Sequence, residues 1–123
     1  MSELDKHQYV LLGTRKKDGS MVDTPVWFAQ QGKTVYMFSA GNAGKVKRLR
    51  NFSDARLAPC TVSGKALGEF VPATATLLDD DASVREAHQQ LVKKYGWQMR
   101  LLDLGARLGG RIKSRAFIKA ELN

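Results

Sequence analysis

The chain contains a single cysteine, Cys60, and only two histidines, His7 and His88. One cysteine cannot form a disulfide within the chain, and the two histidines lie far apart with no acidic residue at ligand spacing. The sequence therefore argues against a disulfide-stabilised domain and predicts no metal centre. Because no activating histidine, lysine or aspartate pattern surrounds Cys60, we expect a buried small side chain there and not a nucleophile.

Long apolar runs are also missing. No segment approaches the roughly 20 apolar residues that a membrane-spanning helix requires. The N-terminal residues 1–6 mix acidic and basic side chains and lack the apolar stretch of a signal peptide. Both observations predict a cytoplasmic protein without a membrane partner.

Positive charge is abundant, with 20 lysines and arginines against 12 acidic residues and a net charge of +8. This excess predicts an anionic partner, but charge alone leaves nucleic acid, a membrane surface and a phosphorylated small molecule open. At 123 residues the chain is long enough for one modest hydrophobic core, and it contains no repeat or linker. We therefore expect a single domain over residues 1–123.

Six segments have the apolar patterns of β-strands, and tight turns link the first three into an antiparallel meander. The predicted strands are 7–15, 21–30, 34–39, 56–62, 68–78 and 111–122. The last of them alternates apolar with mainly basic residues, which predicts a half-buried strand with a basic outer face. Helical periodicity predicts a short basic helix before residue 52, a helix at 83–95 with capping-box spacing at Ser83 and Glu86, and a helix at 97–108. These elements predict a mainly β fold: a six-stranded antiparallel barrel with about three peripheral helices.

The most informative stretch is 39–52, where a turn of small residues joins an apolar strand to the short basic helix. Gly41 and Gly44 permit backbone conformations that direct N–H groups toward an anion. Four cations follow within six residues: Lys45, Lys47, Arg48 and Arg50. The stretch is not a phosphate loop of the Walker type, because Val46 follows Lys45 where that motif needs Ser or Thr. By pattern alone, a solvated basic helix face is the simpler interpretation.

Three segments resemble the pyridoxamine 5′-phosphate oxidase-like split β-barrel superfamily: Thr-Pro-Val-Trp-Phe at 24–28, the stretch 39–50, and Ala-Arg-Leu-Ala-Pro-Cys at 55–60. Within it, the chain is most similar to the small deazaflavin-dependent oxidoreductases, which bind coenzyme F420, with some relatives using FMN. The resemblance spans almost the whole chain. It implies a barrel of the FMN-binding split-barrel type and a homodimer with the cofactor in a groove between subunits. The chain is much shorter than a true pyridoxamine phosphate oxidase, and that reaction is not implied.

The resemblance also implies a set of cofactor-binding residues. They are Thr24, Pro25, Val26, Trp27, Ser39, Ala40, Lys45, Lys47 and Arg48. Residues 25–27 would line the cofactor ring, Ser39 and Ala40 would border it, and the three cations would hold its phosphate and acidic tail. The partner subunit's Arg115 or Phe117 is a candidate to close the groove. Packing in the core is an equally good interpretation of Trp27.

These expectations lead to an oxidoreductase in which reduced F420 delivers a hydride to an unidentified small organic substrate, with FMN as the alternative cofactor. The sequence identifies no catalytic residue, which is compatible with chemistry carried by a cofactor. Two other functions stay open: a non-catalytic binder of a flavin, deazaflavin or tetrapyrrole, and a basic barrel that binds nucleic acid. Aromatic residues make up only 8% and, apart from Phe117, do not interleave with the basic residues of the last strand, so we expect no nucleic-acid partner.

Overall fold

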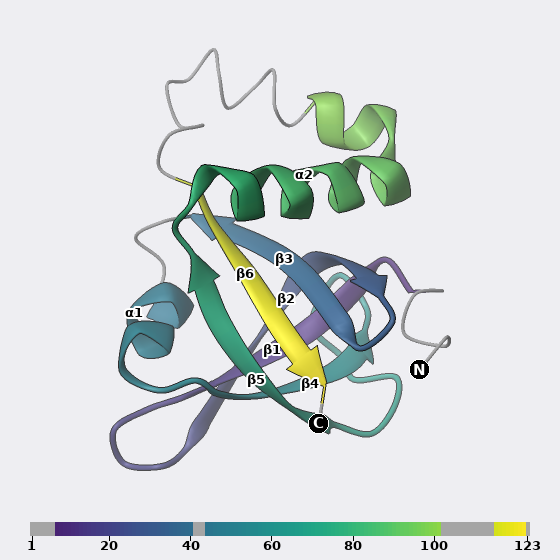
Figure 1. Cartoon of the computed structure of the whole chain (residues 1–123). Coiled ribbons are helices and arrows are strands. Elements are labelled where there is room, and N and C mark those ends of the chain that lie inside the picture. The colour runs from purple at the N-terminus through teal and green to yellow at the C-terminus, as the bar shows by residue number, and fades with distance from the viewer. Residues whose placement is uncertain (1–6, 41–43, 102–114, 123) are drawn as a thin grey trace.

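The computed structural model describes residues 7–40, 44–101 and 115–122. Six antiparallel strands form a closed barrel in the order β1-β2-β3-β6-β5-β4 (Figure 1). The strands are β1 (Tyr9–Arg15), β2 (Met21–Gln31), β3 (Thr34–Ala40), β4 (Asp54–Cys60), β5 (Val71–Leu78) and β6 (Arg115–Leu122). The helices are α1 (Gly44–Asn51) and α2 (Asp81–Tyr95), and residues 97–101 form the described part of a further helix.

The predicted six-stranded antiparallel barrel with three helices is confirmed, and the differences lie at the element boundaries. β4 begins at Asp54 and ends at Cys60, two residues earlier than predicted, and β5 begins only at Val71. The predicted strand residues 111–114 and helical residues 102–108 lie outside the described residues. None of the described helices is long and apolar enough to cross a membrane.

The barrel interior is filled by alternate residues of each strand, as the period of two requires. Its fully buried members are Val10, Leu12, Phe28, Val35, Met37, Leu57, Ala75, Ile118 and Ala120. Leu49 of α1 joins this cluster, while the cations of the same helix remain outside it. β1 is buried on both faces from Val10 to Thr14, which the continuous apolar run in the sequence predicted.

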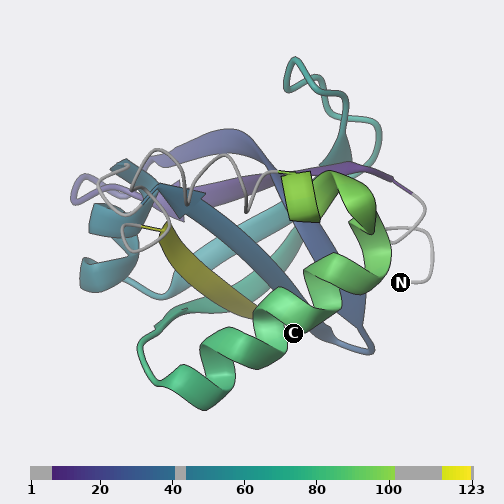
Figure 2. The same cartoon turned by 90° about the horizontal axis from the view of Figure 1, so that it is seen from above.

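α2 lies across the outer surface of the barrel and does not sit at its rim (Figure 2). A second apolar cluster joins Ala87, Leu91 and Tyr95 of α2 to residues of β2, β3 and β6. The helix begins with Asp80 as N-cap, whose carboxylate accepts a hydrogen bond from the Ser83 amide at 2.9 Å. The predicted capping box at Ser83 was therefore wrong, because the preceding acidic residue takes the capping role.

Tyr95, at the end of α2, extends the pairing of β1 and β2 beyond Tyr9, the residue at which β1 begins. Its hydroxyl accepts a hydrogen bond from the Phe28 amide at 3.0 Å and lies 2.6 Å from the carbonyl oxygen of Gln8, to which it can donate. Gln8 directly precedes β1, and the last β1–β2 pair is Tyr9 with Trp27. One side chain from the helix thus occupies a position that a further ladder bond would fill.

Replacing Tyr95 with Phe should lower the free energy of unfolding by about 1–3 kcal/mol, because the buried Phe28 amide loses its acceptor. Urea denaturation measures the loss. Tyr36→Phe is the matched control, since the buried Tyr36 meets Glu86 only at 3.4 Å and should cost less. Equal losses in the two variants would contradict the role assigned to the Tyr95 hydroxyl.

A glycine allows one ion pair to cross a strand on the outer face of the barrel. Gly13 of β1 lies between Asp23 of β2 and Arg56 of β4 in the register of the sheet. Arg56 donates to Asp23 from Nε at 3.1 Å and from Nη2 at 2.7 Å, above the glycine. A Cβ at position 13 would overlap Asp23 Oδ1 and lie 2.7 Å from Arg56 Cγ. The pair is therefore possible only because residue 13 has no side chain.

Candidate functional site

β2 and β3 pair only near the turn that joins them. Their register runs from Gln31 and Thr34 to Phe28 and Met37, and no further β2–β3 pair follows among the described residues. Beyond this point β2 stays paired with β1, and β3 stays paired with β6 as far as Ala40. The two neighbouring strands therefore diverge, and the edges that separate carry backbone groups that no β2–β3 ladder uses.

The residues predicted to line a cofactor ring lie on the diverging part of β2. Val26 faces the barrel interior and is buried, and Thr24 faces the same side two residues earlier. The Thr24 hydroxyl is buried and has no hydrogen-bond partner among the described residues. Pro25 lies on the opposite, outer side and is exposed. A ligand outside the barrel would therefore meet the ring of Pro25 and not the side chain of Val26.

Trp27 lies in the cluster beneath α2. Its ring stacks on Tyr95 with the ring centres 4.2 Å apart and the planes at 8°, and Phe38 meets it edge-on at 6.4 Å. Packing within the protein thus accounts for one face of the Trp27 ring. The remaining part of this partly exposed side chain is what a ligand could contact.

On the diverging part of β3, Ser39 and Ala40 pair with the first two residues of β6. The partner of Ala40 is Arg115, whose guanidinium lies 5.5 Å from the centre of the Phe38 ring. Phe117 is buried, in the cluster beneath α2. On the described outer face of β6, α2 therefore covers Phe117, while Arg115 and Lys119 on either side of it are partly exposed.

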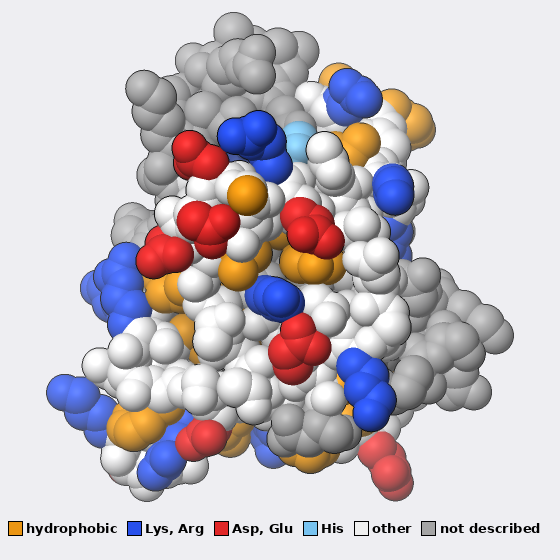
Figure 3. Space-filling view, viewed as in Figure 1, with side chains coloured by type: hydrophobic (Ala, Val, Ile, Leu, Met, Phe, Trp, Pro, Cys, Tyr) orange, Lys and Arg blue, Asp and Glu red, His pale blue; other side chains and the backbone are white. Residues whose placement is uncertain are grey.

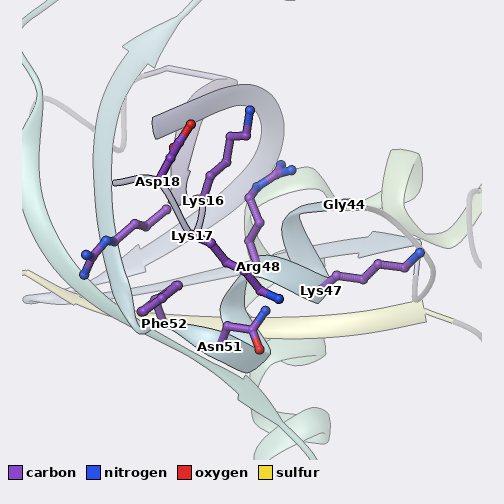
Figure 4. A pocket seen from close by; sticks show the side chains of 9 residues that line it. Lys16, Lys17, Asp18, Gly44, Lys47, Arg48, Asn51 and Phe52 are labelled. Atoms are coloured by element: carbon purple, nitrogen blue, oxygen red, sulfur yellow. The ribbon is translucent and has the colours of Figure 1, made fainter. Parts of the chain in front are cut away.

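A basic hollow of about 480 Å³ lies between α1 and the β1–β2 hairpin (Figure 4). Its lining residues are Arg15, Lys16, Lys17, Asp18, Gly44, Lys47, Arg48, Asn51 and Phe52. Five of these are cations and one is acidic, so the lining attracts anions. In the view of Figure 3, blue lysine and arginine side chains lie along the side where α1 and the hairpin lie, and others are spread over the rest of this face.

Arg48 is held in position within this hollow. Its Nε donates to Thr14 Oγ1 at 2.6 Å, and Thr14 is fully buried. Gly44 leaves room for the guanidinium, since a Cβ there would lie 2.9 Å from Arg48 Nη1. Because Arg48 is positioned before any ligand arrives, less conformational freedom is lost when it binds an oxyanion.

The three cations predicted to hold the phosphate are not all brought together. Lys47 and Arg48 line the hollow, whereas Lys45 is partly buried and is not among the residues that line it. Burial lowers the pKa of Lys45, and the nearby charge of Arg48 lowers it further. An anion bound close to Lys45 would raise this pKa, since it favours the charged form.

Sequence reasoning missed the second wall of the hollow, which is the hairpin. Arg15, Lys16 and Lys17 are consecutive cations before the Asp-Gly turn, but nothing in their spacing connects them with α1 much later in the chain. Arg15 donates to Asp54 Oδ2 at 2.9 Å and lies over the Phe52 ring at 4.5 Å from its centre. The run of three cations was the signal in the sequence for this wall. That the run lies opposite α1 becomes apparent only in the closed barrel.

Cys60 is buried, as the sequence predicted, and burial raises the pKa of its thiol. Among the described residues, no three His, Cys, Asp or Glu side chains gather into a possible metal site. The thiol is therefore a packed side chain of β4, outside the basic hollow.

The Cys60 thiol should react with a disulfide reagent about 100-fold more slowly in the native protein than in urea, because reaction requires exposure and ionisation. Its native rate should still rise with pH above the ordinary thiol range, because the raised pKa keeps the thiol protonated there. Absorbance of the released thiolate measures both rates. Equal rates in the native and unfolded protein would contradict the burial of Cys60.

Comparison with protein-family models and with curated proteins gave no match. Solved structures do match. The heme-storage protein HutZ of Vibrio cholerae has a TM-score of 0.73 at 12% identity, over 99% of this chain and 87% of that one. A candidate pyridoxamine 5′-phosphate oxidase from Listeria innocua has a TM-score of 0.68 at 16% identity, over 99% and 89%. An F420 reductase has a TM-score of 0.62 at 12% identity, over 99% and 92%.

The chain has the pyridoxamine 5′-phosphate oxidase-like split-barrel fold. This confirms, at the level of the fold, the resemblance read from the sequence. Proteins of different names share the split barrel, among them a reductase and a heme-storage protein. The function must therefore be argued from the residues of this split barrel and not from its shape.

Proposed function

We propose that this split barrel is an oxidoreductase that binds a flavin-type cofactor, coenzyme F420 with FMN as the alternative, and acts on a small organic substrate. The observation that carries the proposal is the basic hollow. One of its walls is α1, the helix that follows β3 after β3 has diverged from β2. The likeness of the fold to an F420 reductase supports it. The cytoplasm, suggested by the sequence, is the expected location.

The donor set of the hollow fits a phosphorylated cofactor. The Arg48 guanidinium and the Lys47 ammonium would hold the phosphate, and the Asn51 amide can donate to a further oxygen. Pro25 on the diverging edge of β2, with Ser39 and Ala40 on that of β3, would position the ring. The bound cofactor supplies hydride transfer, and the chain binds and orients it.

We expect a homodimer in which a second copy of the chain completes the cofactor groove. Phe117 packs beneath α2 of its own chain, so Arg115 is the better candidate of the two to reach a ligand near the partner's groove. Analytical ultracentrifugation measures the assembly directly. A monomer at micromolar concentration would contradict this part of the proposal.

Replacing Lys47 with Ala should weaken binding of F420 or FMN at least about tenfold, since an ion pair with the phosphate is lost. Arg50→Ala is the matched control: it removes one exposed cation from the same helix, and Arg50 does not line the hollow. Fluorescence titration of the cofactor measures both affinities. The assignment is wrong if the two variants weaken binding equally.

A second candidate is a non-catalytic tetrapyrrole binder, supported by the likeness of the fold to a heme-storage protein. It predicts a saturable Soret band on addition of hemin and no oxidation of reduced F420 or FMN by added substrates. The oxidoreductase predicts that an added substrate oxidises the reduced cofactor and that hemin gives no saturable Soret band. The two candidates therefore separate in one set of absorbance spectra.

A further inference from the structure

The cations of the hollow come from two walls that face it from different parts of the chain. Arg15, Lys16 and Lys17 belong to the β1–β2 hairpin, and Lys47 and Arg48 belong to α1. Figure 4 shows Lys17 and Arg48 directed toward the hollow from these two walls, while Lys47 extends away from the hairpin. Arg15 already pairs with Asp54, so a ligand that used only the α1 wall would leave Lys16 and Lys17 of the hairpin unused.

Two of the acidic neighbours already have partners. Asp54 accepts from Arg15 at 2.9 Å. Asp18 accepts from both the amide and the hydroxyl of Ser20, at 2.9 and 2.6 Å, and these bonds lower the pKa of its carboxyl so that it stays ionised. Counting five cations against these two carboxylates leaves three positive charges for a ligand.

Three positive charges exceed what one phosphate neutralises. An orthophosphate carries about −1.5 to −2 at pH 7, whereas two linked phosphates carry about −3. The hollow of about 480 Å³ is also larger than a single phosphate group needs. Arginine forks bind carboxylate and phosphate oxygens alike in a bidentate manner, and lysines add point charges, so it is the charge carried per group that favours a phosphate chain here.

We propose that the hollow binds an anion with at least two linked phosphate groups, one held by Arg48 of α1, toward which the exposed Lys47 side chain can turn, and the next by Lys16 and Lys17 of the hairpin. This site goes beyond the proposed function, which needs only the α1 wall. The hairpin lysines select for the length of the phosphate chain. The α1 cations bind either a single phosphate or the first phosphate of a chain.

The test is calorimetric titration of the full chain with inorganic diphosphate and with orthophosphate at about 50 mM salt, where screening is weak. We expect one diphosphate per chain, bound about tenfold more tightly than orthophosphate. Lys16→Ala and Lys17→Ala should each weaken diphosphate binding about fivefold and orthophosphate binding less than about twofold. Lys33→Ala, an exposed lysine in the β2–β3 turn, should change neither affinity.

Equal affinities for the two anions would overturn the inference, as would an equal loss in Lys33→Ala, which would indicate non-specific attraction. Tricarballylate bound as tightly as diphosphate would overturn the assignment to phosphate. The same protein is then titrated with F420 and FMN. If the protein binds diphosphate but neither cofactor, the proposed function is wrong and the inference stands. If it binds a cofactor but does not prefer diphosphate to orthophosphate, the inference is wrong and the proposed function stands.

Discussion

Replacing Arg48 with Ala should weaken binding of F420 or FMN by about 100-fold, the largest effect expected of a single side chain at this site. The protein holds Arg48 through a hydrogen bond to Thr14 Oγ1 and leaves its charge without an acidic partner among the described residues, whereas Arg15 pairs with Asp54. A fixed guanidinium offers two parallel donors to a phosphate without losing much freedom. Fluorescence titration measures the affinity, and circular dichroism verifies the fold.

Arg48→Ala also leaves the buried Thr14 hydroxyl without its donor, which should cost about 1–3 kcal/mol of stability. Thr14→Val separates the two effects, because it removes the hydroxyl and keeps the positive charge. We expect Thr14→Val to bind the cofactor within about fivefold of the unmodified protein. If Thr14→Val and Arg48→Ala lose affinity equally, the phosphate is not held by the guanidinium.

Replacing Gly13 with Ala should lower the free energy of unfolding by about 2–3 kcal/mol. The new methyl group would occupy the space through which Asp23 and Arg56 meet, and both side chains would have to move. Arg56 also lies 4.1 Å from the centre of the Phe70 ring, so its displacement disturbs a second contact. Urea denaturation followed by circular dichroism measures the loss.

A double-mutant cycle isolates the cause of this loss. In a background carrying Asp23→Ala and Arg56→Ala, the atoms that the new Cβ would meet are gone, and Gly13→Ala should then cost less than about 1 kcal/mol. The same cost in both backgrounds would show that Gly13 is needed for the backbone and not for the ion pair.

The strands were predictable because their patterns depend on local periodicity. β1 is buried on both faces and reads as a continuous apolar run, whereas β6 alternates. The position of α2 was not predictable to the same degree. Its apolar stripe indicates that it packs on something, but only the structure shows that Tyr95 joins the backbones of Gln8 and Phe28.

The candidate site was predictable in part. The stretch 44–50 indicated a basic helix, and two of its three proposed anchors, Lys47 and Arg48, line one hollow. The hairpin wall could not be predicted, because its nearness to α1 depends on how the barrel closes. Whether a side chain of β2 faces inward, as Val26 does, or packs beneath α2, as Trp27 does, likewise depends on which faces of β2 the barrel and α2 cover.

Titration of the purified protein with F420 and, separately, with FMN tests directly whether this split barrel binds a flavin-type cofactor. Cofactor fluorescence at about 50 mM salt reports binding, because screening of the basic hollow is weak there. We expect saturable binding of one of the two cofactors at one per chain, with competition by phosphate. Failure of both cofactors to bind would contradict the proposed function.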